Sequence, residues 1–252
     1  MMHVFGSCLA FVYGMVLGSF ANVIGYRLAI GEPIFPRSRC ARCHHTLAAE
    51  ELIPVLSWIA LRGRCSHCRA GISVQYPVIE LTTGLLWMMT FWQAYPIGQM
   101  ALWMTFWLYL MTAVGTDLTS LTVPNILTIP AAGLFLAASG ATGELPWCTA
   151  VIGMCIGYAT IVGIHLLSGG KMGLGDAKLY LAVGAVLGPL RTIESFILAA
   201  IFGSITGIGL RLAGRLQPKQ PVPFVPFIAA GVIVAAFYGT HLMDMYARLL
   251  YR

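Results

Sequence analysis

Residues Trp147–Ser168 have the sequence WCTAVIGMCIGYATIVGIHLLS, which contains no Asp, Glu, Lys or Arg. A helix that crosses the hydrocarbon core of a bilayer needs about 20 mostly apolar residues, and this stretch has that length and character. The stretch therefore predicts a membrane-spanning helix.

Similar apolar stretches recur along the whole chain. Its 252 residues are 58% hydrophobic and 10% charged, with a mean hydropathy of +0.82. Soluble domains carry about 25% charged residues. We therefore expect an all-α polytopic membrane protein with about eight transmembrane helices. The expected helices cover roughly residues 4–26, 78–96, 98–115, 124–141, 147–168, 177–190, 193–211 and 226–247.

The basic residues fall mainly on one side of the expected helices. Cytoplasmic loops carry an excess of Lys and Arg, so we place the loop after the first helix in the cytoplasm and both termini outside. This distribution accounts for the net charge of +6 without a nucleic-acid partner, and leaves contact with anionic lipids open. The cytoplasmic side then holds Arg27, Arg37, Arg39, Arg42, Arg62, Arg64, Arg69, Lys171, Lys178, Arg211, Arg215 and Lys219, and the other side holds Arg191, Arg248 and Arg252.

A polar insertion, residues 31–77, separates the first two expected helices. It contains two Cys-x-x-Cys pairs, a spacing typical of a four-thiolate zinc site. Two disulfides are the alternative, but a cytoplasmic loop is kept reduced. We predict a closed, structural zinc site, because a loop this small has little core of its own and a metal would help it fold. The predicted ligands are Cys40, Cys43, Cys65 and Cys68, and His44, His45 and His67 lie near enough to replace one of them.

Two aspartates stand at the ends of apolar stretches. Asp117 lies in Gly115-Thr116-Asp117-Leu118, and Asp176 lies in Gly173-Leu174-Gly175-Asp176-Ala177-Lys178. An acid beside a membrane core is costly and usually marks a functional site. In the orientation above, the third expected helix ends at the cytoplasmic face near Asp117, and the sixth begins there near Asp176. Both carboxylates are therefore expected at the same face of the membrane.

Two neighbouring carboxylates can hold one proton between them. The ionised group takes a proton from an attacking water, and the protonated group hydrogen-bonds the scissile carbonyl, which is the chemistry of peptide-bond hydrolysis. The alternative is a proton- or cation-coupled membrane transporter that uses the paired acids. Taken singly, either aspartate could be an interfacial acid or a helix cap. The sequence contains no Gly-x-Ser-x-Gly, His-Glu-x-x-His or P-loop motif that would favour other chemistry.

Several motifs, in order along nearly the whole chain, resemble those of the bacterial type IV prepilin peptidases. Members of this family are polytopic membrane aspartyl proteases. The motifs are Gly18–Leu28 (GSFANVIGYRL), the four-cysteine loop with Ile53–Trp58 and Tyr76–Leu81, Asp117 with Pro124-Asn125 downstream, Gly173–Leu179 followed by Gly184 and Gly188, and Pro223–Phe227.

The resemblance implies an endopeptidase that removes the basic leader from type IV prepilins or type II secretion pseudopilins. Cleavage is expected at the cytoplasmic face of the bacterial inner membrane. Many members also methylate the new N-terminus with S-adenosylmethionine. The resemblance makes Asp117 and Asp176 the catalytic pair and the four cysteines the zinc ligands. Together with the polar insertion, these roles divide the chain into three expected parts: residues 1–30 as the first transmembrane helix, 31–77 as the zinc-binding loop and 78–252 as the membrane protease core.

The basic leader of such a substrate needs a partner on the enzyme side. It is expected to meet anionic lipid headgroups, or one of the few acids in the region. Glu80 begins the second expected helix at the membrane face, where a substrate contact and a purely structural role are both open. The sequence-based expectation is that Glu80→Gln weakens substrate affinity. The local acids are Glu32, Glu50, Glu51 and Glu80.

Overall fold

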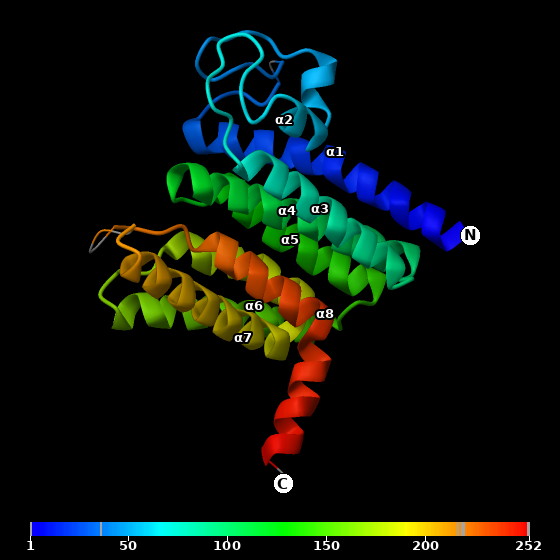
Figure 1. The fold of residues 1–252 in the computed structure, drawn as a ribbon. Helices are drawn as coiled ribbons and strands as arrows, with labels where there is room; N and C mark the ends of the chain where they lie inside the picture. The colour runs from blue at the N-terminus through cyan, green and yellow to red at the C-terminus, as the bar shows by residue number, and fades with distance from the viewer. Residues whose placement is uncertain (1, 36, 216, 218–219, 251–252) are drawn as a thin grey trace. The chain divides into compact units, whose positions relative to one another are not determined.

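A computed structural model describes the chain except for residues 1, 36, 216, 218–219 and 251–252 (Figure 1). Lys219 and Arg252, which entered the count of basic residues, lie outside the described part. The described residues form helices and two isolated β-bridges, which confirms the all-α fold class. The chain divides into two compact units, Met1–Thr119 and Ser120–Arg252.

The first unit contains three long helices, α1 (Met2–Ile30), α3 (Gln75–Trp92) and α4 (Ile97–Ser120). The segment between α1 and α3, which we call the cysteine loop, carries the 3-10 helix η1 (Ala49–Leu52) and the short helix α2 (Leu56–Ala60). Figure 1 shows α1 and α3 running side by side below this loop.

Close contacts at glycines show how α3 is oriented along α1. Gly6 of α1 lies against the ring of Phe91, and Gly18 lies against Thr83. Residue numbers thus rise along one helix as they fall along the other, so the two helices are antiparallel. Between these contacts, a Cβ added to Gly84 would come within 2.9 Å of the Phe11 carbonyl oxygen. Small residues allow this approach of two backbones, as they do in many membrane helix pairs.

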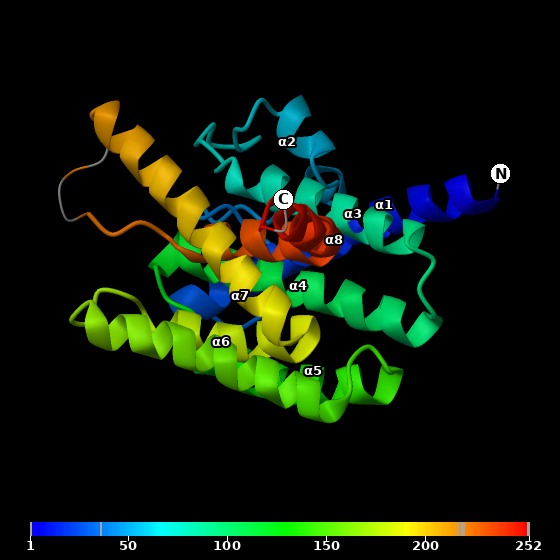
Figure 2. The same ribbon diagram turned by 90° about the horizontal axis from the view of Figure 1, so that it is seen from below.

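The second unit contains α5 (Asn125–Thr142), α6 (Trp147–Leu167), α7 (Leu174–Leu212) and α8 (Val225–Leu250) (Figure 2). Helix α6 is the stretch that opened the sequence analysis, and it forms as predicted.

Helix α7 consists of two arms joined at Gly188. This residue has φ 73° and ψ 178°, a conformation that only glycine adopts readily, and Pro189 follows it. The hydroxyl of Ser195 lies 3.4 Å from the Tyr180 hydroxyl although the two residues are 15 positions apart. A straight helix would separate them by about 22 Å, so the chain reverses direction at Gly188. The expected helices 177–190 and 193–211 are these two arms.

Glycines also bring α6 and α7 together. A Cβ added to Gly153 of α6 would lie 2.3 Å from the carbonyl oxygen of Gly184, and one added to Gly184 would lie 2.3 Å from the carbonyl oxygen of Gly153. Gly157, one turn further along α6, lies against the Tyr180 carbonyl. Neither glycine of the central pair leaves room for a side chain, so the backbones of the two helices touch.

Within the described residues, six helices are long and apolar enough to cross a membrane. They are α1 and α4–α8, with α7 taken as one helix. The reversal at Gly188 divides α7 into two arms, and α3 adds an 18-residue helix packed along α1. The total then agrees with the eight expected segments. The protein is therefore a multi-pass membrane protein.

Candidate active site and metal centre

The two Cys-x-x-Cys turns of the cysteine loop share one backbone pattern. In the first, the Cys40 amide donates to the His45 carbonyl at 2.9 Å, and the His44 amide donates back to Cys40 at 2.9 Å. In the second, Cys65 bonds Ala70 at 2.8 Å and Arg69 bonds Cys65 at 3.1 Å. His44 and Arg69 occupy the same place in each turn, and both have φ 58°. Matching β-bridges, Arg39 with Thr46 and Arg64 with Gly71, close the two turns.

These turns bring four thiols to one point. The sulfur atoms of Cys40, Cys43, Cys65 and Cys68 all lie within 4.8 Å of one another, and Cys40 Sγ is 3.8 Å from Cys68 Sγ. A tetrahedron of thiolates with Zn–S distances of about 2.3 Å has S–S edges of about 3.8 Å. The donor set and its spacing therefore fit zinc.

The thiols of this cluster differ in how readily they ionise. Hydrogen bonds from the backbone amides of Cys43 and Arg42 lower the pKa of the Cys40 thiol to about 6. At Cys43, a hydrogen bond from the His45 amide is outweighed by burial and by hydrogen bonds with the other three thiols, which raise the pKa to about 12. A thiolate, and not a thiol, is the form that binds a metal. The cluster consists of cysteines alone. His45 and His67 lie outside it, with their rings stacked at a centroid distance of 5.0 Å.

Asp117 lies in the last turn of α4 and is 5% exposed. The helix around it is pressed against α1. A Cβ added to Gly25 of α1 would lie 2.7 Å from the Thr112 carbonyl and 3.2 Å from the Gly115 backbone. Gly25 of the motif Gly18–Leu28 therefore has a structural role, because its lack of a side chain lets α1 cross α4 about one turn before Asp117.

Asn22 is a residue of this region that sequence reasoning did not single out. It is fully buried, and its Oδ1 accepts a hydrogen bond from Gln75 Nε2 at 3.1 Å. The same Oδ1 would lie 3.3 Å from a Cβ added to Gly115. Its Nδ2 has no hydrogen-bond partner among the described residues. A polar side chain within an apolar stretch was the sequence signal that could have identified it.

Asp176 is the third residue of α7, and it is half-buried. Its amide donates to the carbonyl of Gly173, the residue that precedes the helix, at 3.2 Å. Two residues on, Lys178 Nζ donates to Asn125 Oδ1 at the start of α5, at 2.7 Å. Gly175 packs against the backbone of Val123. The start of α5 is thus fastened to the helix turn that carries Asp176.

Pro124 and His165 complete the surroundings of this turn. Pro124 is the residue directly before α5, so the helix begins one residue later than the expected range 124–141. The ring of His165, near the end of α6, forms a hydrogen bond of 2.6 Å with the Met172 carbonyl and so holds the glycine-rich segment before α7. Asp117 and Asp176 belong to different units, and their pairing stays a prediction.

Glu80 has a different setting from the one expected for a substrate-binding acid. The carboxylate lies at the start of α3, is 6% exposed, and accepts a hydrogen bond from the Val55 amide at 2.7 Å. Val55 has φ 63° and ψ −49°, which is unfavourable for a β-branched residue. This geometry favours the structural role of Glu80, because the carboxylate holds a strained turn of the cysteine loop.

Comparison with known families agrees with the motifs found in both units. Residues 12–94 match the bacterial peptidase A24 N-terminal domain, and residues 102–208 match the type IV leader peptidase family. No solved structure matches the chain significantly.

Curated relatives resemble the chain over nearly its full length. A protein of Bacillus subtilis (strain 168) is 33% identical over 96% of this chain and 98% of its own length. A protein of Aeromonas salmonicida (strain A449) is 34% identical over 94% of this chain and 92% of its own length. A protein of Burkholderia pseudomallei (strain 1026b) is 36% identical over 92% of this chain and 85% of its own length. Each is named prepilin leader peptidase/N-methyltransferase. With both family domains in order and relatives matched from end to end, the chain belongs to the type IV leader peptidase family.

Proposed function

We propose that this protein cleaves the leader from type IV prepilins or type II secretion pseudopilins at the cytoplasmic face of the bacterial inner membrane. The end-to-end similarity to proteins named prepilin leader peptidase/N-methyltransferase carries this proposal. The two buried or half-buried aspartates at helix ends supply the matching chemistry. Nothing in the fold or in the comparisons favours the transporter alternative.

Asp117 and Asp176 are the proposed catalytic pair. With one proton between them, the ionised aspartate takes a proton from water as the water oxygen attacks the scissile carbonyl. The protonated aspartate hydrogen-bonds the carbonyl oxygen, and a proton then passes to the leaving amine. Because the pair titrates as a unit, the two roles are assigned to the pair and not to either residue.

Zinc is the proposed occupant of the four-cysteine cluster. A site with four protein ligands has no open position for substrate, so the metal would hold the cysteine loop together and take no part in hydrolysis. Residues 31–77 are accordingly proposed as a zinc-binding loop between the first transmembrane helix, 1–30, and the protease core, 78–252.

The name of the relatives also supports a second proposed activity, N-methylation of the new N-terminus with S-adenosylmethionine. Membrane lipids are proposed partners of the basic cytoplasmic side, beside the prepilin substrates. Cleavage and methylation can be separated in one assay.

Purified protein in detergent is mixed with a prepilin, with and without S-adenosylmethionine, and the mass of the product is measured by mass spectrometry. We expect a shortened pilin in both reactions and an added methyl group only with the methyl donor. An unshortened prepilin in both would contradict the peptidase proposal. A shortened pilin that never gains a methyl group would contradict the methylation proposal alone.

A further inference from the structure

The cysteine loop carries an exposed apolar surface on η1 and α2. Leu56 and Ile59 stand about one turn apart on α2 and are 65% and 59% exposed. Leu52 and Ile53, just before α2, are 43% and 47% exposed. We call these four residues the α2 patch. Four exposed apolar residues next to one another, in a loop rich in arginine, mark a contact surface.

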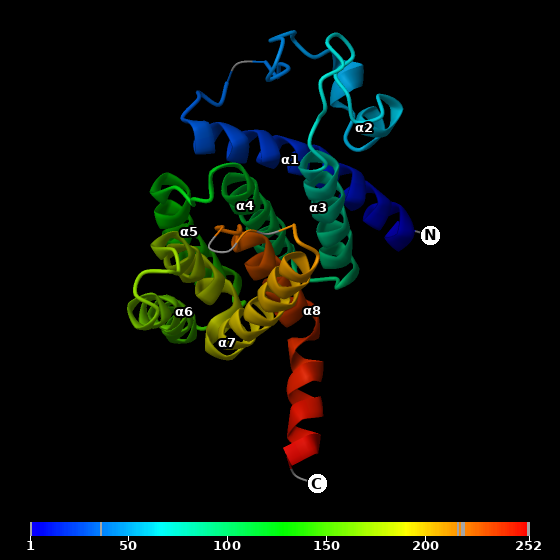
Figure 3. The ribbon, with the colours of Figure 1, turned by 60° about the vertical axis from the view of Figure 1, so that its left-hand side comes forward.

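The α2 patch is tied to the sides of the membrane helices and not to their ends. Val55, directly before α2, is hydrogen-bonded to Glu80 of α3. Glu80 in turn lies beside Gly18 of α1, where an added Cβ would be 3.3 Å from the Glu80 Cα. Gly18 precedes Arg27, at the cytoplasmic end of α1, by about 13 Å along the helix axis. Figures 1 and 3 likewise show α2 beside α1 and α3.

Contacts on the inner side of α2 fix which residues point outward. The indole N–H of Trp58 donates to the Ile72 carbonyl at 3.1 Å, and its ring lies against Gly63. The bond from Val55 to Glu80 holds the strained turn that starts the helix. With Trp58 turned inward, Leu56 and Ile59 occupy the outer face of α2.

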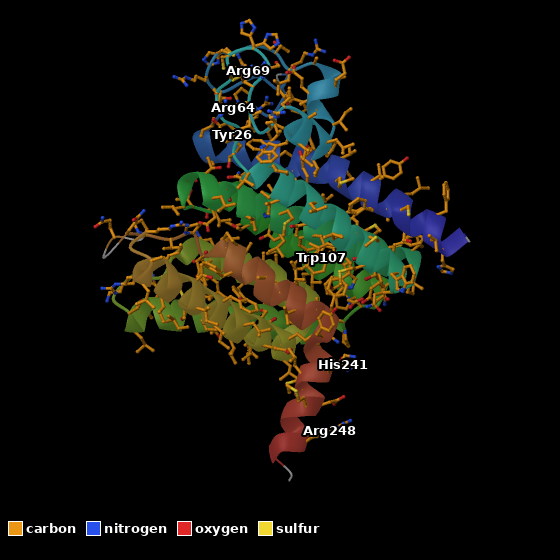
Figure 4. All side chains as sticks on the ribbon, in the orientation of Figure 1. Tyr26, Arg64, Arg69, Trp107, His241 and Arg248 are labelled. Carbon is orange, nitrogen blue, oxygen red and sulfur yellow. The ribbon has the colours of Figure 1, made fainter. Side chains whose placement is uncertain are left out.

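The surroundings of the α2 patch identify its occupant as lipid. Phe20 of α1 and Val78 of α3 lie two residues from Gly18 and Glu80, and they are 53% and 54% exposed. Two residues span about 3 Å along a helix axis, so Phe20 and Val78 lie at nearly the same depth as Gly18 and Glu80, although on other faces of their helices. Exposed apolar residues on membrane-spanning helices contact lipid, so the α2 patch lies at the depth of a lipid-facing surface. Three exposed arginines, Arg62, Arg64 and Arg69, follow α2. Figure 4 labels Arg64 and Arg69 in the loop above Tyr26 of α1.

We propose that the α2 patch is an interfacial membrane anchor. Its apolar side chains would enter the boundary between headgroups and acyl chains, and the neighbouring arginines would contact anionic headgroups. The level of Gly18, well inside Arg27, places the patch at that boundary and not in bulk water. The anchor would hold the cysteine loop flat against the membrane surface. It is independent of the proposed peptidase activity.

Lipid quenching tests this proposal on the full-length protein. A fluorescent amino acid is placed at Ile59, or at the exposed Thr46 of the first Cys-x-x-Cys turn as a control, and each variant is put in nanodiscs of anionic lipid brominated on the upper acyl chain. We expect at least about threefold stronger quenching at Ile59 than at Thr46, because only the patch enters the bilayer. Equal quenching at both positions, or quenching at neither, overturns the proposal.

Hydrogen exchange gives a second test without a probe. In anionic nanodiscs, the double variant Leu56→Gln and Ile59→Gln should exchange faster than the unchanged protein over residues 49–61, while its metal content stays the same. Thr46→Asn is the matched control and should leave that segment unchanged. If residues 49–61 exchange alike in the double variant and the unchanged protein, the patch does not insert and the proposal fails.

Discussion

The cysteine loop and the α6–α7 pair are both held by close backbone packing, but over very different sequence distances. In the loop, each Cys-x-x-Cys turn is closed by hydrogen bonds between residues four or five positions apart. In the helix pair, Gly153 touches Gly184 from a separate helix. A turn is specified by the residues that form it. A close contact between two helices requires glycine at a matching position in each of two distant segments. Neither glycine by itself predicts the contact.

The two regions also carry different functional groups. The loop carries a closed set of four thiols, and the helices carry the aspartates. Damage to the loop should therefore change metal binding and loop order first, whereas damage to the helix ends should change hydrolysis first.

The largest expected effect is on the proposed catalytic aspartates. Asp117→Asn or Asp176→Asn should lower prepilin cleavage by at least about 10⁴-fold, because an amide keeps the shape but cannot pass a proton. Cleavage rate and metal content are measured together, and the metal content should not change. Asp244→Asn, a substitution of an exposed aspartate in α8, is the matched control. Near-normal cleavage by either catalytic variant would rule out the aspartyl mechanism.

The next largest effect is expected in the loop. Cys65→Ser removes a buried member of the cluster and should weaken zinc binding at least about 100-fold, since even changes outside the ligand set cost 10–100-fold. Elemental analysis after dialysis against a mild chelator measures the retained metal, expected at one ion per unchanged chain. Cys155→Ser, at an exposed position on α6, is the control and should retain zinc. An ordered, active and metal-free preparation of the unchanged protein would contradict the structural role of zinc.

A smaller effect, confined to the helix pair, is expected for Gly153→Ala. The new methyl group meets the Gly184 carbonyl, and overpacking of this kind costs about 1–3 kcal/mol. Gly163→Ala on the same helix meets nothing within 4 Å and should be neutral or slightly stabilising. Thermal unfolding in detergent compares the two variants. If both unfold at the same temperature, the backbones of α6 and α7 are not in contact as described.

The smallest effect is expected for Glu80→Gln. Glu80→Gln keeps an oxygen that can accept the Val55 amide, so processing should change little. Glu80→Ala leaves that amide unpaired, at a cost of about 1–3 kcal/mol, and should speed hydrogen exchange around α2. Kinetics on leaders with two, four and six basic residues give the opposing test. A rise in KM for Glu80→Gln that grows with leader charge would restore the substrate-binding role.

Much of the architecture could be predicted because membrane crossing depends on local composition. The stretch that forms α6 contains no Asp, Glu, Lys or Arg, and length and hydropathy alone decide such a case. The arms of α7 were also expected as separate helices. Eight crossings also required the chain to reverse between them. The backbone conformation of that turn was not expected, because φ 73° at Gly188 depends on what packs around the turn. Likewise, the role of Glu80 was left open because nothing local links it to Val55, 25 residues away.

The sequence by itself determined the thiol cluster, the apolar helices and the two acids at helix ends, because spacing and hydropathy act over a few residues or one helix length. The tertiary structure alone decided that Glu80 holds a strained turn, that Gly25 lets α1 cross α4 near Asp117, and that α2 exposes Leu56 and Ile59. Each of these depends on which backbone from a distant segment comes within a few ångströms. At Gly25 and Gly115 the absence of side chains permits that approach, and at Glu80 a side chain must reach a backbone amide 25 residues away. Both are properties of pairs of segments and not of either one.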